Sequence, residues 1–532
     1  MSSKVMFLYP NHEGYFRAPV GLTLIMTVTE IAGHEVKLFD TTFMNVSENK
    51  DDAVRVKSGQ VKPVSMDNYF TKKSKEQIEN AWLDAIEKFS PDLIATTIVE
   101  DSYEFADRLL NIAKKKFNIP VVVGGSMPTV VPQVIIENPN IDYVVEAEGE
   151  VSVPELLSAM EKDGDVSKVP NLWYKKDKKV LQTGLVKYLN MDDIPNQRLH
   201  FWDSKQFTKP YCGKLYTTGF FEASRGCMHK CHYCINRAFQ VFQEESGKVR
   251  RNKSVNRIIE EVKALHKKMN FGLIMFTDDN FLARQPKELD ELFDRWGKEI
   301  KVPYWINTCI ETVNDRNLPQ LKSSGCVGIG IGLETGSDWV RQHLLLKGKM
   351  HNDFYMEKFA LMAKYKIRST ANNMIGIPGE YEADFFETIK LNKAIRALNK
   401  DLTSFDVSFM APYMGTVIHN IALEMNLIKV HDKPGFKGMS KMNISMRQES
   451  TMVNPCMTKE RIMELFYDFA DYVSGKKDIP EKYLKNDLSR RYADSNEIYE
   501  LYEKYKQGPI DPVLIVPKES IKEKQLEETI RR

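Results

Sequence analysis

The sequence predicts an α/β protein with three parts: a doubly wound parallel sheet, a partial (β/α)6 barrel and a helical C-terminal region. Short apolar runs of strand length alternate with helical segments, first in residues 1–165 and again in residues 211–420. Such runs are apolar throughout, which is typical of parallel strands buried on both faces. From about Ile421 the pattern becomes helical and charged, and 532 residues exceed what one core usually contains.

The first part contains five strand-length runs separated by helical segments. Gly33 marks the end of the first helical segment, as glycine commonly does. Helical crossovers between buried strands favour a doubly wound parallel sheet. The expected strands are Val5–Tyr9, Val36–Phe39, Leu93–Ile98, Pro120–Val123 and Tyr143–Val145, and the expected helices are Val20–Ala32, Lys75–Phe89, Tyr103–Lys116 and Val130–Glu137.

A polar segment, residues 166–210, is expected to connect this sheet to a second αβ series. Six strands with helices between them indicate an open or partial barrel rather than a complete eight-stranded one. The expected strands are Tyr216–Ala223, Leu273–Thr277, Tyr304–Ile310, Val327–Leu333, Ser369–Ile375 and Thr403–Met410, with helices such as Val255–Met269 and Lys287–Ile300.

Composition excludes several classes of protein. Lysine plus arginine (75) nearly balance aspartate plus glutamate (73), so no general basic field indicates a nucleic-acid partner. Apolar runs such as Ile119–Val123 are far shorter than the ~20 residues of a membrane-spanning helix. The first ten residues do not have the pattern of a signal peptide. We therefore expect a cytoplasmic protein without a membrane span.

A tight group of cysteines follows the first strand of the second series. Residues 224–234 read SRGCMHKCHYC, so Cys227, Cys231 and Cys234 have the spacing Cys-x3-Cys-x2-Cys. The loop lies at the carboxyl end of a barrel strand, where this architecture carries its chemistry. Three thiolates can bind three irons of a [4Fe–4S] cluster and leave the fourth iron open to a substrate or cofactor.

Structural zinc is the alternative, because His229 or His232 could complete a Cys3His site. Zinc sites usually pair two distant knuckles, and the sequence has no second one, so the iron–sulfur interpretation is favoured. The remaining cysteines lack a partner at ligand spacing. Two of them, Cys309 and Cys326, are expected to be buried free thiols in strands, and no role is assigned to Cys212 or Cys456.

Further motifs follow the cysteines at successive strand ends: FTDDNF (276–281), GIGIGLETGS (328–337), MIGIPGE (374–380) and APYMGT (411–416). The first part contains VVVGGSMPTVVP and IDYVVEAEGE. Together these motifs resemble the B12 (cobalamin)-dependent radical S-adenosylmethionine (SAM) enzymes, over residues ~5–420. The resemblance implies a cobalamin-binding-like domain at 1–165, a connector at 166–210, a radical SAM partial barrel at 211–420 and a helical C-terminal region at 421–532.

For the barrel, the resemblance implies that Cys227, Cys231 and Cys234 hold the cluster while SAM binds the fourth iron. Tyr233 is expected against the adenine of SAM, mostly through its backbone. The remaining residues that the resemblance assigns to SAM are acidic or amide side chains and a glycine at strand ends, namely Asp279 with the adjacent Asp278, Asn280, Glu334 and Gly376. The acidic members have a competing role as helix-capping or first-turn charges.

For cobalamin, the resemblance implies binding along the strand ends of the first sheet. The expected contacts are Gly124, Gly125, Ser126, Thr129, Glu148, Gly149 and Glu150. A tight βα turn is a second explanation for the paired glycines. His12 lies in the loop where related domains carry a cobalt ligand, but YPNHEGYF lacks the strict Asp-x-His-x-x-Gly motif, so His12 is interpreted as a loop residue.

The resemblance implies a radical SAM enzyme that methylates an unactivated carbon, or phosphorus, centre of a biosynthetic intermediate. Its expected cofactors are a [4Fe–4S] cluster, SAM and cobalamin, and its expected partners are a small-molecule or peptide substrate and an external one-electron reductant of the flavodoxin or ferredoxin type. A cyclase, oxidoreductase or rearrangement enzyme without net methyl transfer is the alternative. Methylthiolation would need further N-terminal cysteines, and none precedes Cys212. A binding or electron-transfer module with a structural cluster is disfavoured by the open iron site.

Overall fold

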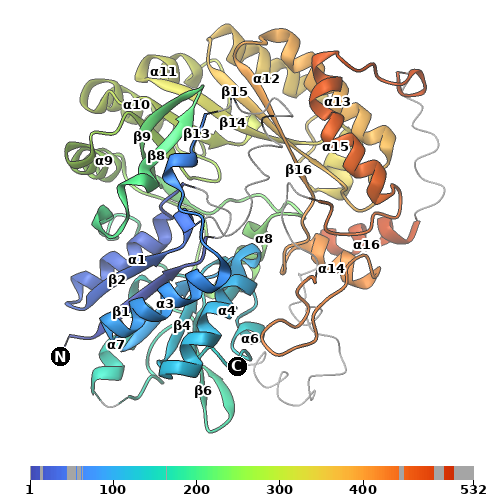
Figure 1. Cartoon of the computed structure of the whole chain (residues 1–532). Helices are drawn as coiled ribbons and strands as arrows, with labels where there is room; N and C mark the ends of the chain where they lie inside the picture. Colours follow the sequence, from blue (N-terminus) through green and yellow to red (C-terminus); the bar gives the residue numbers. More distant parts are fainter. Residues whose placement is uncertain are drawn as a thin grey trace.

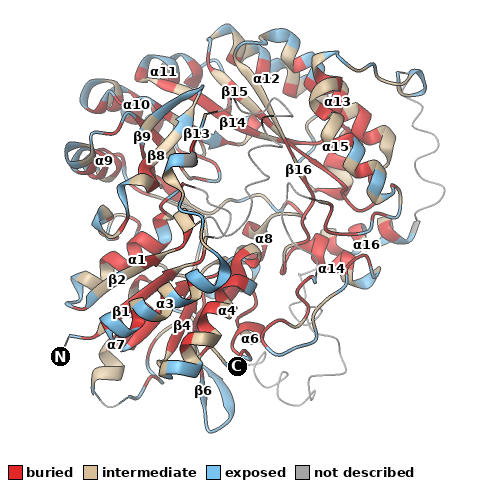
Figure 2. Ribbon diagram, viewed as in Figure 1, coloured by how far each residue is buried: buried red, intermediate tan, exposed pale blue. Residues whose placement is uncertain are grey.

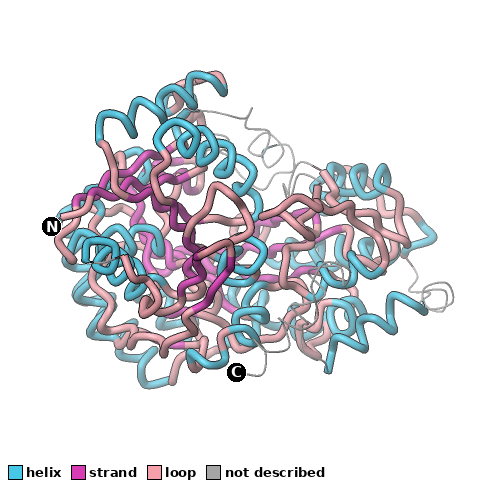
Figure 3. Tube along the Cα trace, turned by 90° about the horizontal axis from the view of Figure 1, so that it is seen from below, coloured by secondary structure: helices cyan, strands magenta, loops and turns pink. Residues whose placement is uncertain are grey.

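Two seven-stranded sheets organise the molecule, and a helical region follows them. In the computed structural model, which describes residues 2–11, 16–44, 56, 62, 64–162, 164–441, 449–484 and 496–507, the first unit lies below the barrel sheet in the view of Figure 1. Strand cores are buried in both sheets (Figure 2). Seen from below, the strands of both units run through the interior with helices outside them (Figure 3). The predicted α/β fold is confirmed.

The first sheet has the strand order β2-β1-β3-β4-β5-β6-β7. Its first five strands are parallel, and each begins and ends within two residues of the sequence prediction. Their bounds are β1 Lys4–Tyr9, β2 Glu35–Asp40, β3 Leu93–Thr97, β4 Val121–Gly124 and β5 Tyr143–Val145. A hairpin of β6 Leu172–Lys176 and β7 Lys179–Gln182 adds two antiparallel strands. The sheet therefore continues into the segment expected to be a connector.

Helices cover both faces of this sheet because its strands are apolar on both faces. Along β1, Val5 and Phe7 face one core, which helices α1 and α7 also enter, while Met6 and Leu8 face the other, shared with α3 and α4. The helix bounds are α1 Val20–Ile31, α3 Lys75–Phe89, α4 Glu100–Phe117 and α7 Gly149–Lys162.

The helix predicted at Val130–Glu137 is instead two short helices, α5 Ser126–Val130 and α6 Pro132–Ile135. Pro132 explains the break. Proline lacks an N–H group and disfavours the helical conformation in the residue before it, and Val131 indeed has φ −132° and ψ 52°.

The second sheet has the order β16-β15-β14-β13-β12-β9-β8, and its six barrel strands are parallel. These strands also lie within two residues of their predicted bounds. An antiparallel strand, β8 Thr208–Tyr211, adds to one edge. The parallel strands are β9 Lys214–Phe221, β12 Leu273–Phe276, β13 Tyr304–Thr308, β14 Cys326–Glu334, β15 Arg368–Ile375 and β16 Thr403–Phe409.

Helices pack on the outer side of the barrel sheet around a core that includes Ile274, Ile329 and Ile331. A separate pair, β10 Ser224–Arg225 and β11 Arg251–Asn252, lies beside the cysteine segment. The helices of this unit are α8 Ile235–Phe242, α9 Val255–Met269, α10 Pro286–Arg295, α11 Asn317–Ser324, α12 Asn352–Lys364 and α13 Glu382–Leu398.

The C-terminal region contacts both units. Its helices are α14 Val417–Glu424, α15 Lys459–Ser474 and α16 Asn496–Gln507. Helix α15 packs against β16 and α13 through residues such as Phe466, whose ring stacks on Phe409 at 4.1 Å. Phe436 stacks on Tyr103 of the first unit at 4.3 Å. These contacts fix the barrel sheet relative to the first sheet. Residues 518–532, expected to form a solvated helix or tail, lie outside the described residues.

No helix among the described residues is both long and apolar enough to cross a membrane.

Candidate functional site

The cysteine triplet lines a cavity of about 210 Å³ at the carboxyl end of the barrel strands. Cys231 is buried, and Cys227 and Cys234 are half-buried. The opposite walls come from the segments that follow β12 and β13 and from the end of β14, and they include Asp279 and Glu334. One short loop therefore presents three thiols to one cavity.

Buried contacts hold the start of this loop. The Asp278 carboxylate accepts a hydrogen bond from the Ala223 N–H at 2.9 Å and another from the Ser224 hydroxyl. Burial raises the pKa of Asp278 to about 6. Asp278 thus supports the cysteine loop and does not line its cavity.

The back of the loop packs against the C-terminal helix α16. His232 donates from Nδ1 to the Leu344 carbonyl at 2.9 Å, and its ring stacks on Tyr502 at 5.8 Å. Arg237 donates to the Tyr505 carbonyl at 2.6 Å. Because His232 is held here and does not line the cysteine cavity, it is not placed to complete a Cys3His zinc site.

Strand β14 has one apolar face and one glycine face. Ile329, Ile331 and Leu333 enter the outer core. Gly328, Gly330 and Gly332 alternate with them and lie on the inner face, because neighbouring strand residues are on opposite sides of a sheet. A β carbon at Gly332 would lie 2.8 Å from Lys347 Nζ and closer still to a Glu334 carboxylate oxygen. The glycines thus leave room for these side chains beside the cavity.

A group of three polar side chains closes this part of the cavity. Tyr233 donates from its hydroxyl to Glu334 Oε1 at 3.1 Å, and Lys347 Nζ lies 2.9 Å from the same oxygen. Lys347 also donates to the Tyr233 hydroxyl at 3.0 Å. Burial alone would lower the pKa of Lys347, but the adjacent Glu334 carboxylate raises it well above its ordinary value. Lys347 therefore stays charged beside the cysteine loop.

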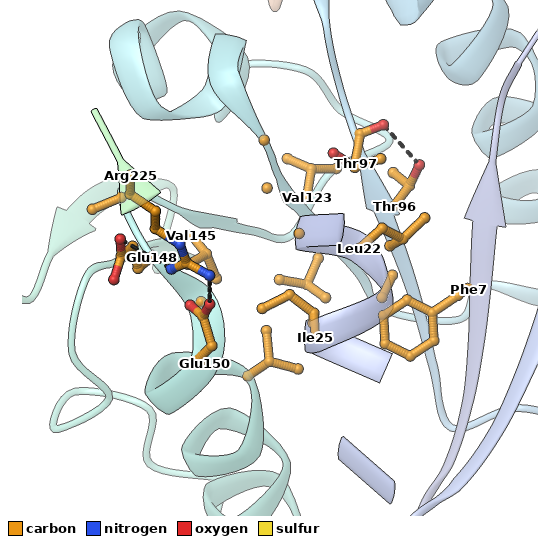
Figure 4. Close-up of a pocket in the computed structure, with 18 of the residues that line it drawn as sticks. Phe7, Leu22, Ile25, Thr96, Thr97, Val123, Val145, Glu148, Glu150 and Arg225 are labelled. Atoms are coloured by element: carbon orange, nitrogen blue, oxygen red, sulfur yellow. Dashed lines mark hydrogen bonds and ion pairs between the residues drawn. The ribbon is translucent and has the colours of Figure 1, made fainter. Parts of the chain in front are cut away.

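A second cavity, of about 300 Å³, lies at the carboxyl end of the first sheet, between α1 and β3–β5. Figure 4 shows Phe7, Leu22 and Ile25 on one side of it and Arg225 with Glu150 on the other. Gly124, Gly125 and Gly149 also line it. Gly125 has φ +112°, and a β carbon there would lie 2.6 Å from the Ile98 carbonyl oxygen. This turn therefore requires glycine and leaves its backbone accessible at the cavity.

An ion-pair network joins the loops of the two units. Arg225, two residues before Cys227, lies 3.0 Å from Glu148, 2.7 Å from Glu150 and 2.8 Å from Glu222. Arg251 also pairs with Glu148. All of these side chains are mostly buried, so the strand-end loop of the first sheet is bound to the cysteine loop by charge-assisted contacts.

A third cavity, of about 260 Å³, lies between these two. It shares Ala147, Glu148, Glu222 and Arg225 with the first-sheet cavity and Asn236 and Asp279 with the cysteine cavity. The three cavities therefore form a row that runs from the carboxyl end of the first sheet to the cysteine loop.

Comparison with family models gives two matches, one for each α/β unit. The model described as the radical SAM superfamily matches residues 221–391, and the B12 binding domain model matches residues 14–157. The two models together, in this order, decide the family. The chain belongs to the cobalamin-dependent radical SAM enzymes.

Relatives of this enzyme include methyltransferases and a cyclase. It is 27% identical to an uncharacterized methyltransferase of Pyrococcus horikoshii, over 64% of this chain and 72% of that protein. It is 23% identical to the anaerobic magnesium-protoporphyrin IX monomethyl ester cyclase of Synechocystis, over 59% of this chain and 60% of the cyclase. It is 24% identical to the cytidylyl-2-hydroxyethylphosphonate methyltransferase of Streptomyces wedmorensis, over 62% of this chain and 63% of that methyltransferase. The chain thus spans less than two thirds of the last two.

A solved structure has the same fold. The radical SAM methyltransferase TsrM of Kitasatospora setae, with cobalamin and a [4Fe–4S] cluster bound, superposes with a TM-score of 0.58 at 17% identity over 82% of each chain. At this identity the likeness concerns the fold.

The enzyme's cofactors are a [4Fe–4S] cluster, SAM and cobalamin, and the two outer cavities fit them. Three thiols that line one cavity suit a cluster with one open iron. The first-sheet cavity lies at the carboxyl ends of parallel strands, where doubly wound folds bind ligands. Its glycine turn and apolar walls suit part of a large cofactor that lies close to the backbone.

The structure brings most of the predicted site residues to these cavities. Cys227, Cys231, Cys234, Tyr233, Asp279 and Glu334 line the cysteine cavity; Gly124, Gly125, Glu148, Gly149 and Glu150 line the first-sheet cavity; and Thr129 lines the cavity between them.

Other predicted residues lie elsewhere. Asn280 is buried, and its side-chain amide oxygen accepts hydrogen bonds from the Thr308 hydroxyl at 2.7 Å and the Cys309 N–H at 3.2 Å. Gly376 faces Ile462, and its N–H donates to Glu380 at 2.8 Å. Ser126 is the first residue of α5 and lines none of the three cavities. His12 lies outside the described residues.

Sequence reasoning missed several residues in the cysteine cavity, among them Cys309 and Lys347. Cys309 was expected to be a buried strand thiol, but it is half-buried and lines this cavity, because β13 ends at Thr308 and leaves it in the following turn. Lys347 follows Glu334 by 13 residues, and no local pattern marks it. Cys326 is buried in the barrel core, as expected.

Proposed function

We propose that this enzyme methylates an unactivated carbon, or phosphorus, centre of a biosynthetic intermediate. The main observation in support of this proposal is the row of three neighbouring cavities. A substrate in the middle cavity would lie between the cysteine cavity and the first-sheet cavity. When bound, the cluster with SAM supplies the 5′-deoxyadenosyl radical, and cobalamin supplies the methyl group.

In this proposal the residues of the protein bind the cofactors and position them around the substrate. Cys227, Cys231 and Cys234 hold three irons, and the Tyr233–Glu334–Lys347 group binds polar parts of SAM. Asp279 lines both the cysteine cavity and the middle cavity, so it is placed to orient SAM toward the substrate. The Arg225 network keeps the two cofactor loops at a fixed separation.

The lining of the middle cavity supports a polar substrate. Tyr188, Gln243, Asn236 and Arg251 all contribute to it. Gln243 is buried, and its side-chain N–H group has no hydrogen-bond partner among the described residues. A buried donor without a partner is costly, and an acceptor on a ligand would satisfy it. A small molecule, or the polar end of a peptide, fits this lining.

Formation of a ring without methyl transfer is the second candidate, and the similarity to the Synechocystis cyclase favours it. For either reaction we expect an external one-electron reductant of the flavodoxin or ferredoxin type and a cytoplasmic location, where such reductants are found.

The first experiment quantifies cofactors. The protein is purified anaerobically, reconstituted with iron, sulfide and hydroxocobalamin, and desalted. About four irons and one corrinoid per chain are expected. Cys227→Ala, Cys231→Ala and Cys234→Ala should each lose most of the iron, whereas Cys212→Ala, at an exposed position, should keep it. Four irons without corrinoid would refute the methyltransferase proposal.

The second experiment separates the two reactions. Candidate substrates are incubated with SAM carrying a deuterated methyl group, and nucleoside products are quantified. Methyl transfer predicts 5′-deoxyadenosine and S-adenosylhomocysteine in similar amounts, with the label in the product. 5′-Deoxyadenosine without S-adenosylhomocysteine would support ring formation instead.

A further inference from the structure

Two cysteines and a histidine lie close together in the cysteine cavity. Cys227 and His229 belong to the cysteine loop, and Cys309 follows β13 on the opposite wall. The two sulfur atoms and a ring nitrogen of His229 all lie within 4.8 Å of one another. Among the described residues, no other three cysteine, histidine or acidic side chains have ligand atoms this close, so the triplet Cys227, Cys231 and Cys234 is spaced more widely.

The two spacings suit different metal centres. Two thiolates bound to one zinc ion at about 2.3 Å in a tetrahedral site lie about 3.8 Å apart, and a histidine nitrogen fits the same shell. The thiolates of a [4Fe–4S] cluster lie farther apart, because each binds a different iron. The wide triplet therefore suits the cluster, whereas the close group of Cys227, His229 and Cys309 suits a single ion.

Hydrogen bonds hold the backbone on both sides of this close group. Gln240 of α8 donates from its side chain to the carbonyl of Cys227 at 2.6 Å and to that of His229 at 3.0 Å. On the opposite wall, the Cys309 N–H donates to the buried side chain of Asn280 at 3.2 Å. Because these backbones are fixed by protein contacts, the three donors are preorganised and metal binding would cost little further ordering.

A carboxylate supports the histidine. Nε2 of His229 lies 2.9 Å from a carboxylate oxygen of Glu311. Histidines that bind metals commonly donate their other ring N–H to a carboxylate in this way. In the neutral ring, the bond to Glu311 places the proton on Nε2 and leaves Nδ1 available to a metal ion.

We propose that the cluster-free enzyme binds one Zn²⁺ through Cys227, His229 and Cys309. Binding releases the two thiol protons to solvent, forms two zinc–sulfur bonds and one zinc–nitrogen bond, and transfers no electron. Thiolate and imidazole are donors that suit Zn²⁺. Because Cys227 is also a cluster ligand, zinc and the cluster exclude each other and zinc would keep the enzyme without its cluster. This exclusion rests on the proposed function, whereas the zinc site does not.

The first test is a Co²⁺ titration of the full-length, cluster-free protein under anaerobic and reducing conditions. One Co²⁺ per chain should bind with the absorption bands of tetrahedral cobalt that carries two thiolates, and Zn²⁺ should displace it. Cys309→Ala and His229→Ala should weaken cobalt binding by about tenfold or more. Cys234→Ala, a matched change at a cluster ligand, should leave the spectrum unchanged. A spectrum lost in Cys234→Ala and kept in Cys309→Ala would overturn the inference.

A second measurement needs no variant to fold. Wild type is alkylated with iodoacetamide with and without Zn²⁺, and the modified peptides are quantified by mass spectrometry. Zn²⁺ should slow the modification of Cys227 and Cys309, because a metal-bound thiolate is a poorer nucleophile, and the exposed Cys212 should react as before. Protection of Cys231 and Cys234 without protection of Cys309 would contradict the inference.

Cluster assembly tests the exclusion. Iron and sulfide are added to wild type and to Cys309→Ala at increasing Zn²⁺. Zinc should slow cluster formation in wild type, and about tenfold more Zn²⁺ should be needed for the same effect in Cys309→Ala. An equal zinc dependence would refute the exclusion. Wild type that does not take up about four irons even without zinc would refute the proposed function, while the cobalt titration would still decide the zinc site.

Discussion

Replacing Arg225 with glutamine should strongly destabilise the enzyme, because three carboxylates surround this guanidinium. Its side chain is 15% exposed, and those of Glu150 and Glu222 are 5% and 12% exposed. Among the described residues, neither glutamate has another basic side chain within ion-pair distance, whereas Glu148 keeps Arg251. The variant would leave two nearly buried carboxylates without a direct ion-pair partner among the described residues.

Removing one partner of a buried ion pair costs about 3–5 kcal/mol. At about 2–4 °C per kcal/mol for a unit of 150–250 residues, this predicts a melting temperature lower by roughly 6–20 °C. The assay is thermal unfolding at pH 8 followed by tryptophan fluorescence. Arg316→Gln is the matched control, since its pair with Asp290 is half exposed and should be worth at most about 1 kcal/mol.

Two further measurements separate the destabilisation caused by the lost charge from that caused by lost packing contacts. The combined variant Arg225→Gln, Glu150→Gln, Glu222→Gln should regain much of the stability because it has no uncompensated carboxylates. The deficit of Arg225→Gln should also be smaller at pH 5 than at pH 8, since protonation neutralises the unpaired acids. A loss no larger than that of Arg316→Gln, or no gain in the combined variant, would refute the reasoning.

Three other predictions follow from the same structure. Gly332→Ala should weaken SAM binding about tenfold in equilibrium dialysis with iron content unchanged, since its methyl group would collide with Lys347 and Glu334; Gly297→Ala, where the nearest atom is 3.6 Å away, should bind normally. Burial raises the pKa of Glu100 to about 8, so this group makes wild type lose stability as pH rises from about 4.5 to 8, and Glu100→Gln should show a smaller fall in melting temperature between pH 5 and pH 8; an equal fall would contradict this. Tyr502→Ala should release iron to a chelator faster than the exposed control Glu500→Ala, and equal rates would count against support of the cysteine loop by α16.

The strands and the cysteine loop could be predicted because their signals are local. Uniformly apolar runs identify buried parallel strands, and the spacing of Cys227, Cys231 and Cys234 is readable within eight residues. The glycine turn at the end of β4 is marked equally clearly, because Gly124 and Gly125 directly follow three consecutive valines. For each of these features, neighbouring residues in the sequence suffice.

The remaining features depend on tertiary contacts that no local pattern encodes. Asp278 and Asn280 belong to one motif with Asp279, yet only Asp279 lines the cysteine cavity, because the β12 turn directs its two neighbours into buried hydrogen bonds. The hairpin β6–β7 was not predicted because β7 is exposed along its whole length and β6 ends in two exposed lysines. Arg225 meets Glu148 only because the two units pack together.

The packing of α16 behind the cysteine loop also bears on how the protein is made. His232 and Arg237 find their partners in Tyr502 and Tyr505, more than 260 residues later in the chain. During translation the cysteines leave the ribosome long before this support exists. Iron delivered to the growing chain would meet an unsupported loop, so maturation is best ordered with synthesis through residue 507 first and cluster insertion afterwards.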